Sequence, residues 1–381
     1  MNNKPTIKIL VTKIRERFVM SCFINKKSPT KKIFTVTIIL LMTVFLSGCN
    51  KEKFYSNDFF AMDTWMSVQI PNVSTEEDTV EHLKNIEAKI REIENSFSVT
   101  LQASDLYKLN NSSEETIEVK NDDFIKVLTE ALRYEQMTDK AFSPRLYKIS
   151  REWGFTTGSY KIPEDDIIKE YLEEISASEI SVDGNMVSRT PGIMIDFGAI
   201  AKGYAADVVV EYLKANNIPK AIINLGGNVY MLGSKDEETG WIVGVNDPFA
   251  DRLLGTIELS DACVVTSGNY ERYFEQDGKR YHHIIDSATG SPSDSGLASV
   301  TVISADASYA DALSTALFVM GVDKAIEFWR NNENFEFVLV TENKEVYYSE
   351  LLENEVFSFD QGIIEDGYVL KLIRKRGQGC D

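Results

Sequence analysis

The chain contains few of the residues that build disulfide frameworks and zinc sites. Its 381 residues include four cysteines and three histidines. Cysteines this sparse do not form a disulfide scaffold, and three histidines with so few thiols argue against a structural zinc site. The sequence also has no G-x-x-x-x-G-K-[ST], no G-x-G-x-x-G and no G-x-S-x-G segment. The signatures of the phosphate-binding loop, the dinucleotide fingerprint and the serine-hydrolase elbow are therefore missing.

Positive charge is also in short supply. Lysine and arginine total 40 against 59 aspartates and glutamates, for a net charge of −19. Such a chain repels nucleic acid, and we expect no nucleic-acid partner. An anionic ligand must then be met by local cations or by a metal ion. The length allows a substantial core, the composition is that of a globular protein, and we find no internal repeat or low-complexity linker.

The first 48 residues differ from the rest of the chain. They carry nine basic residues and one acid, and they end in an uncharged run of sixteen residues, Ile33–Gly48. That length is short for a membrane span and suits the apolar core of a signal peptide. Leu46-Ser47-Gly48-Cys49 resembles the bacterial lipobox, in which the cysteine becomes the lipid-modified first residue. We therefore expect export, lipidation at Cys49 and anchoring on the outer face of the cytoplasmic membrane, with a mature net charge of −27. A plain signal anchor and a start at Met20 remain open.

One stretch in the middle of the chain combines a predicted strand, a turn and a helix. Ile193-Met194-Ile195 is an apolar run typical of a buried strand, and helical spacing follows from Ala199 to about Asn216. A helix that begins after a strand directs N–H groups and the positive end of its dipole beyond the strand, which favours an anion such as phosphate. Lys202 adds a positive charge there, and Asp196 could bond a sugar or base or help to hold a cation. A helix cap with a solvated lysine explains this stretch equally well.

The rest of the chain predicts helices and strands in mixed order. We expect an amphipathic helix ending at Phe97, a polar loop with Asp105 and Asn110, and a second helix from Asn121. Gly226-Gly227 suits either a bulge or a close approach to a ligand, and a bulge is the simpler interpretation. The pattern indicates an α+β fold, a single domain of mixed sheets flanked by helices. Predicted strands include 65–70, 221–225, 241–245, 255–259, 262–266, 281–286, 298–304, 335–341 and 346–349.

Two polar residues on a later predicted helix suit a magnesium ion. Asp311 and Thr315 are four residues apart, so a helix places both oxygens on one side. A carboxylate and a hydroxyl are ligands for a hard cation such as Mg²⁺, although the polar flank of a buried helix gives the same pair. His282 and His283 are adjacent on a predicted strand, so they point to opposite faces and cannot both serve one site.

A set of motifs in one order carries a family resemblance. The motifs are Ala61-Met62-Asp63-Thr64, Phe97-Ser98 through Leu109-Asn110, Trp153-Gly154-Phe155, Asp196 to Asp207, Asn224-Leu225-Gly226-Gly227, Thr266 to Tyr270, Tyr281 to Ile284 with Asp286 and Thr289-Gly290, and Ala310-Asp311 with Thr315. Each motif alone is weak, but together in register they are specific. Through these motifs the chain resembles the ApbE family of flavin transferases, formerly called thiamine-biosynthesis lipoproteins, from about Phe59 to Thr341, and the lipobox agrees.

The resemblance implies roles for individual residues. His283 would lie near the reacting phosphate, and it is our candidate base. Two positions depart from the family pattern, because Ser143 stands where an acid is usual and Asp63 where many members have glycine. Implied Mg²⁺ ligands are the Ala199 carbonyl, Asp311 and Thr315. Implied FAD contacts are Met62, Ala141, Phe142, Ser143, Asp196, Lys202, Gly226, Gly227 and Ile284.

The function that the resemblance implies is FAD:protein FMN transfer. A threonine hydroxyl of an acceptor flavoprotein attacks the FMN phosphorus of FAD, AMP leaves, and FMN becomes phosphoester-linked, with Mg²⁺ offsetting charge on the pyrophosphate. The alternatives are an FAD pyrophosphatase that uses water and a lipoprotein that binds flavin, or another solute, without turnover. The expected parts are a signal peptide (1–48), a tether (49–58), a catalytic domain (59–350) and a C-terminal extension (351–381).

Overall fold

The computed structural model describes residues 52–236, 238–353 and 356–375. The predicted signal peptide and the lipidation site Cys49 lie outside these residues. One compact unit comprises Tyr55–Asp381, and the fold described below belongs to it. In the described part of the chain, no helix has the length and apolar character needed to cross a bilayer.

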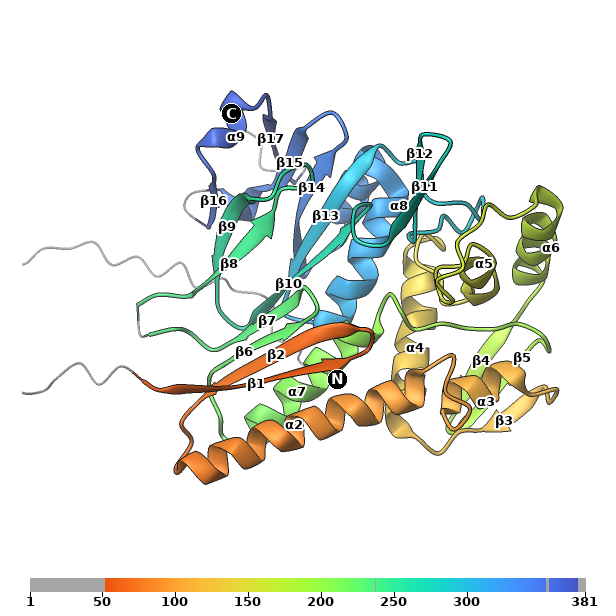
Figure 1. The fold of residues 1–381 in the computed structure, drawn as a ribbon, viewed down its shortest axis with the longest axis horizontal. Helices are drawn as coiled ribbons and strands as arrows, with labels where there is room; N and C mark the ends of the chain where they lie inside the picture. The colour runs from red at the N-terminus through yellow and green to blue at the C-terminus, as the bar shows by residue number, and fades with distance from the viewer. Residues whose placement is uncertain (1–51, 237, 354–355, 376–381) are drawn as a thin grey trace, which may run out of the picture. The chain divides into compact units, whose positions relative to one another are not determined.

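A nine-stranded sheet runs through this unit (Figure 1). Among the described residues its strand order is β1-β2-β6-β7-β10-β13-β14-β15-β17. Pairing is antiparallel from β2 to β15, and β17 joins β15 in parallel. The strands are β1 (Phe54–Ala61), β2 (Thr64–Pro71), β6 (Ala221–Leu225), β7 (Asn228–Leu232), β10 (Ala262–Gly268), β13 (Leu297–Ser304), β14 (Phe335–Thr341), β15 (Glu345–Ser349) and β17 (Val369–Ile373).

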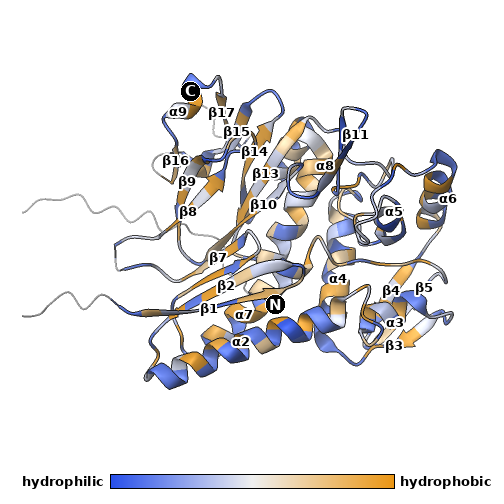
Figure 2. Cartoon of the chain, in the orientation of Figure 1, coloured by the Kyte–Doolittle hydropathy of each residue, from blue (hydrophilic) through white to orange (hydrophobic). Residues whose placement is uncertain are grey.

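Helices α2, α7 and α8 pack against this sheet and bury its apolar face. α8 contacts β10 and β13, α7 contacts β6 and β7, and α2 contacts β2 and α7. Figure 2 shows hydrophobic residues concentrated in the central strands and in α7 and α8, while α2 also carries hydrophilic stretches. Every residue of β13 is buried, as expected for a strand covered on both faces. The helices are α2 (Glu76–Phe97), α3 (Asp105–Asn111), α4 (Asp122–Met137), α5 (Tyr147–Glu152), α6 (Asp165–Ser176), α7 (Ala201–Ala215), α8 (Ala307–Asn331) and α9 (Gly362–Glu365), with a 3-10 turn η1 (Glu350–Leu352).

Three smaller sheets surround the main one. Their strand orders, in the part of the chain that is described, are β3-β5-β4, β16-β9-β8 and β11-β12. Within the hairpin β11-β12 the rings of Phe274 and Tyr281 stack with centroids 5.1 Å apart, and the Phe274 ring packs in a tilted arrangement on Trp153, at the end of α5, with centroids 6.4 Å apart. The strands are β3 (Thr116–Glu118), β4 (Ile180–Asp183), β5 (Met186–Arg189), β8 (Trp241–Asn246), β9 (Leu253–Leu259), β11 (Tyr273–Gln276), β12 (Lys279–His282) and β16 (Phe357–Phe359).

The α+β prediction is confirmed, but several local expectations are not. β1 begins at Phe54, inside the segment expected as a tether. β16 and β17 lie in the expected C-terminal extension and complete two sheets by pairing with β9 and β15. The loop expected around Asp105 and Asn110 is helix α3, whose N-cap Ser104 accepts the N–H of Tyr107 at 2.9 Å. Short elements with polar residues around them carry too little periodicity to be detected.

Candidate active site

The crossing of α7 and α8 brings the two predicted halves of the site together. The N–H of Gly203, on the first turn of α7, donates to Oδ2 of Asp311 at 2.9 Å. In return, Asp207 accepts the N–H groups of Ala307 and Ser308, at the start of α8, at 2.9 and 2.8 Å. Each helix therefore satisfies N–H groups that the other leaves unpaired. A Cβ on Gly203 would lie 2.2 Å from the Ala307 carbonyl oxygen, so this close crossing requires glycine.

The segment before α7 is extended, but the strand predicted at Ile193–Ile195 is wrong. The N–H and carbonyl of Ile195 both pair with the side-chain amide of Asn110, at 2.8 Å each. The N–H of Asp196 donates to the Pro144 carbonyl at 2.8 Å. A side chain and a loop thus replace the neighbouring strand that buried backbone groups otherwise need. An apolar run reports burial, and it does not say which groups complete the hydrogen bonds.

Asp196 and Lys202 lie on either side of the turn that starts α7. The N-cap of α7 is Ile200, without a side-chain cap, so the helix-cap interpretation of Asp196 is wrong. Its carboxylate instead accepts the N–H of Gly198. Burial raises the pKa of Asp196, and the Gly198 hydrogen bond and the charge of Arg272 oppose that rise only in part. Lys202 is half-buried on the first turn of α7, where the sequence predicts it.

The residues predicted as metal ligands share this corner. Asp311 is buried, and within the described residues only its Oδ2 accepts a hydrogen bond, from the Gly203 N–H. Thr315 lies one turn later on α8 and is half-buried. Ala199 lies in the turn before α7, four residues ahead of Gly203. The described residues contain no cluster of three or more His, Cys, Asp or Glu side chains suited to a metal. A carboxylate, a hydroxyl and a carbonyl form a different, all-oxygen set, which suits Mg²⁺ when substrate phosphate and water complete it.

The two adjacent histidines have different surroundings. His282 is buried at the end of β12, with Nε2 3.0 Å from the Ser293 carbonyl and Nδ1 accepting the N–H of the buried Ile284 at 3.3 Å, so its role is structural. His283 follows the strand, and its Nδ1 lies 3.2 Å from the Arg272 carbonyl oxygen. Because a carbonyl can only accept, Nδ1 carries the proton and Nε2 is the basic nitrogen. Burial, with the charge of Arg272, lowers the pKa of His283 to about 4, so the ring is neutral at neutral pH.

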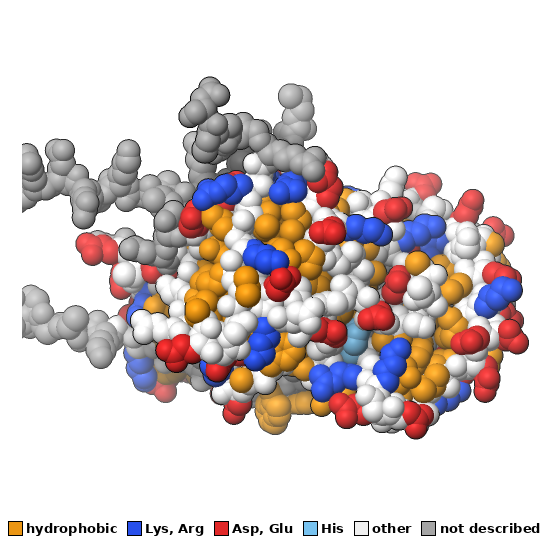
Figure 3. Space-filling model, turned by 90° about the horizontal axis from the view of Figure 1, so that it is seen from above, with side chains coloured by type: hydrophobic (Ala, Val, Ile, Leu, Met, Phe, Trp, Pro, Cys, Tyr) orange, Lys and Arg blue, Asp and Glu red, His pale blue; other side chains and the backbone are white. Residues whose placement is uncertain are grey.

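Two charged residues of the site escaped the prediction, Glu271 and Arg272. Burial raises the pKa of Glu271, while Lys202 and Arg272 lower it and Asp311 raises it. The charges of Lys202, in α7, and Asp311, in α8, therefore both act on Glu271. Figure 3, which views the molecule from above, shows one histidine side chain at the surface with Lys, Arg, Asp and Glu side chains around it. The available signal was a pair of opposite charges shortly after a buried strand, which does not by itself indicate a site.

Two hairpin turns meet at the end of the nine-stranded sheet. Met62-Asp63 joins β1 to β2 with φ of 47° and 58°, and Gly226-Gly227 joins β6 to β7 with φ of 66° and 94°. The glycine pair is therefore a turn, and the predicted bulge is wrong. A Cβ on Gly226 would lie 2.3 Å from Cγ2 of Thr64, whereas Gly227 faces open space. Aspartate tolerates the left-handed conformation at position 63, so its departure from the family's glycine preserves the turn.

The segment 141–143 is held in place by contacts with buried residues of the protein. The Phe142 ring is buried in the core, 6.5 Å from the ring of Tyr134, so only its backbone can face a ligand. Ser143 Oγ donates to Oε1 of the buried Glu135 at 2.5 Å, and Arg145 Nε donates to Oε2 at 3.0 Å. Glu135 thus supplies an acid next to the position where the family pattern has one.

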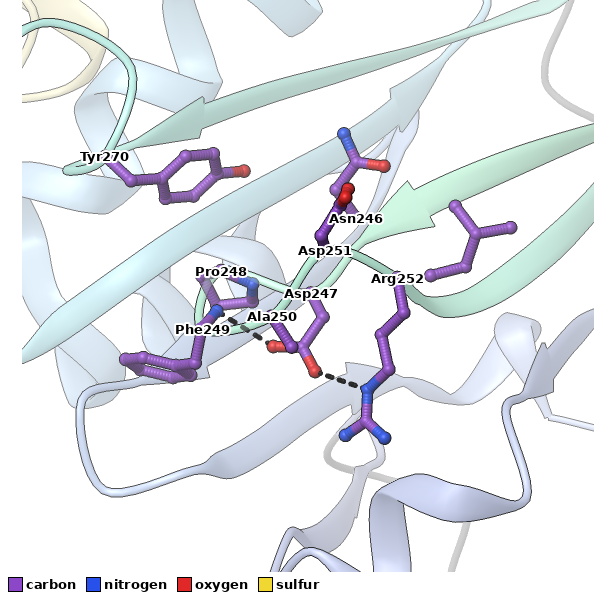
Figure 4. A pocket seen from close by; sticks show the side chains of 9 residues that line it. Asn246, Asp247, Pro248, Phe249, Ala250, Asp251, Arg252 and Tyr270 are labelled. Carbon is purple, nitrogen blue, oxygen red and sulfur yellow. Dashed lines mark hydrogen bonds and ion pairs between the residues drawn. The ribbon is translucent and has the colours of Figure 1, made fainter.

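A cavity of about 510 Å³ lies between the β8–β9 connection and Tyr270, the residue before Glu271 (Figure 4). Its buried carboxylate, Asp247, accepts Arg252 Nε at 3.0 Å and the N–H of Phe249 at 2.9 Å. Arg252 also pairs with Asp366 at 2.5 Å. None of the predicted site residues lines the cavity. Its walls are Asn246, Asp247, Pro248, Phe249, Ala250, Asp251, Arg252, Leu253 and Tyr270.

Comparison with known proteins agrees with the motifs. The sequence pattern of the ApbE family matches residues 62–339. The chain belongs to the ApbE family. It is 31% identical over 328 residues to the FAD:protein FMN transferase of Haemophilus influenzae, covering 81% of this chain and 93% of that protein. A Klebsiella pneumoniae enzyme of the same name is 41% identical over 216 residues, 55% of this chain and 66% of that protein. The ApbE protein of Thermotoga maritima superposes with a TM-score of 0.72 at 34% identity, covering 79% and 98% of the two chains.

Proposed function

We propose that this ApbE-family chain is an exported, lipid-anchored FAD:protein FMN transferase that uses Mg²⁺ and a threonine of an acceptor flavoprotein. The observation that carries the proposal is the hydrogen bond from Gly203 to Asp311, which joins the corner bearing Lys202 to the helix bearing Thr315. Relatives that match most of the chain are named for this activity. The lipobox at Cys49 supports an anchor on the outer face of the cytoplasmic membrane.

The residues at this corner fit Mg²⁺ and FAD. Asp311 keeps one carboxylate oxygen without a hydrogen bond in the described part of the chain, and Thr315 and the Ala199 carbonyl supply further oxygens. When bound, Mg²⁺ offsets the negative charge of the pyrophosphate. Lys202 adds a fixed cation, which matters in a chain whose mature net charge is −27.

The chain's own residues then position the transfer. The threonine Oγ forms a bond to the FMN phosphorus as the bond from that phosphorus to the bridging oxygen of AMP breaks. The threonine proton needs an acceptor. Nε2 of His283 can accept it, because Nδ1 carries the ring proton and donates it to the Arg272 carbonyl. Lys202 stabilises the charge that accumulates on the departing AMP phosphate. Most of the acceleration comes from positioning and charge neutralisation, as in other phosphoryl transfers.

The test is to incubate the mature protein with FAD, Mg²⁺ and candidate extracytoplasmic flavoproteins. Intact mass should show one phosphoester-linked FMN, and peptide mapping should place it on a threonine. AMP release without an acceptor would identify an FAD pyrophosphatase instead, and unchanged FAD would identify a binding protein. Membrane fractionation of a Cys49→Ala variant tests the anchor separately, since that variant should lose its lipid and leave the membrane fraction.

A further inference from the structure

The buried side chain of Asn228 has no hydrogen-bond partner in the described part of the chain. Asn228 is the first residue of β7 and is 3% exposed. Its Nδ2 is buried without an acceptor, and no described residue bonds to its Oδ1. Buried amides are nearly always hydrogen-bonded, because an amide that loses its hydrating water without gaining a protein partner destabilises the fold. Asn110 shows the ordinary case, with both ends of its buried amide bonded to Ile195.

The strand register places Asn228 on the face of the sheet that α7 covers. Asn228 pairs with Leu225, and Leu225 pairs with Met66. Residues directly opposite each other on antiparallel strands point to one face, and Leu225 and Met66 belong to the main core. The chain passes from α7 to β6 through residues 216–220, so the first turn of α7 lies at the end of the sheet where β6 ends (Figure 1). Asn228 is therefore at the Lys202 end of the sheet.

The neighbouring turn leaves room for a ligand. Gly227, directly before Asn228, would meet no heavy atom within 4 Å if it carried a Cβ. Its N–H donates to Asn224 Oδ1 at 3.0 Å, which holds the turn in place. An unpaired buried amide at the end of the sheet where α7 begins, directly after an open turn, is the arrangement expected of a binding group whose ligand is not bound.

We propose that the Asn228 amide binds the edge of a heteroaromatic ring of the bound dinucleotide. The inference rests on the proposed function, which makes FAD the ligand. Lys202 and Arg272 suit the phosphates, whereas a neutral amide presents a donor beside an acceptor. A ring edge with an acceptor beside a donor satisfies both, as when asparagine binds the edge of adenine. FAD has two such edges, the imide of the flavin and the amino-pyrimidine edge of the adenine.

The test replaces Asn228 with leucine, which has a similar size and no polar group. We expect the unliganded Asn228→Leu protein to be at least as heat-stable as wild type, because the unpaired amide is gone. Its affinity for FAD should fall by about 10- to 100-fold. Titrations with FMN and with ADP identify the ring, since only the half that Asn228 binds should lose affinity. Asn228→Asp keeps the shape of the side chain and removes the donor, so it should also lose FAD affinity. It replaces the leucine variant in the test if that variant does not fold.

Asn224→Leu is the matched control, because the Asn224 side chain is exposed near the end of β6 and its one hydrogen bond within the described residues comes from the Gly227 N–H. It should bind FAD within about 3-fold of wild type. Equal losses in the Asn224 and Asn228 variants would assign the effect to the turn and overturn the inference. So would an Asn228→Leu protein that is destabilised yet binds FAD normally. Wild-type protein that does not bind FAD would instead overturn the proposed function itself.

Discussion

The α7–α8 corner and the cavity beside Tyr270 are both polar, but they differ in how their polar groups are satisfied. In the cavity, Asp247 and Arg252 pair with each other and with groups around them (Figure 4). At the corner, Asp311 has one engaged oxygen, and the nearby Asn228 amide has no partner among the described residues. Among the described residues, the charged groups of the cavity therefore pair with one another, whereas the corner keeps polar groups without a partner. Groups left incomplete in a folded protein are a better guide to a binding site than open volume.

The largest expected effect on FMN transfer is that of Asp311→Ala. Removing a carboxylate from a metal that neutralises pyrophosphate should reduce transfer by more than about 100-fold at limiting Mg²⁺. The lost bond to Gly203 should lower the free energy of unfolding by only about 1–3 kcal/mol, leaving a folded protein. Transfer rates over a Mg²⁺ titration, with circular dichroism for the fold, measure both. If Asp311→Ala transferred FMN at the wild-type rate at limiting Mg²⁺, the metal site would not be at this corner.

Replacement of His283 should come next. His283→Gln should reduce the transfer rate constant by about 10²-fold, the lower end of a general base's contribution, if Nε2 accepts the threonine proton. A pKa of about 4 keeps the ring neutral above that pH, so His283 itself should cause no fall in rate between pH 8 and pH 6. The wild-type rate should decline as His283 becomes protonated near pH 4. An inflection near pH 6.5 that disappears in His283→Gln would show that the free ring is not held as described.

A smaller effect is expected for Lys202→Ala. Loss of a charge-assisted contact to phosphate should weaken FAD binding by about 10-fold, because such contacts contribute about 1.5–3 kcal/mol. The affinity for Mg²⁺ measured without FAD should change less, since Lys202 is not a metal ligand. Titration calorimetry with each ligand separates the two. Equal losses for both ligands would mean that the corner as a whole has been disturbed.

The smallest effect on transfer is expected at the cavity, for Asp247→Ala. Although burial opposes it, hydrogen bonds from Tyr368, Phe249 and Arg252 hold the pKa of Asp247 below its usual value. The folded protein therefore gains stability from this carboxylate above the unfolded pKa, near 4, and loses it as the pH falls below that value. Removal should lower the free energy of unfolding at pH 7 by about 1–3 kcal/mol, because it leaves the Phe249 N–H and the Tyr368 hydroxyl without their acceptor. Transfer by the folded fraction should stay near wild type, and a large loss would make the cavity part of the site.

The sequence predicted the parts of the site that depend on local spacing. Asp311 and Thr315 share a helix face because they are four residues apart, and Lys202 falls on a first helical turn because the apolar period begins there. The motifs in register identified the family, which no single segment could have done. The α+β class followed from the mixture of helical and strand periods along the chain.

The parts that escaped prediction depend on partners far apart in the chain. Asn110 replaces a strand partner for Ile195 across 85 residues, and Asp207 caps α8 across 100. The charges of Lys202 and Asp311 act on Glu271 only because the folded chain brings these distant residues near it. Periodicity reports which residues are buried, but it does not report which polar groups the fold leaves without a partner.

The most direct test of the shared site is the dependence of FAD affinity on Mg²⁺, measured by fluorescence in wild type and in Asp311→Ala. If one corner holds both ligands, saturating Mg²⁺ should tighten FAD binding to wild type at least 10-fold, and Asp311→Ala should lose that coupling. An FAD affinity indifferent to Mg²⁺, or a coupling that survives in Asp311→Ala, would contradict the account.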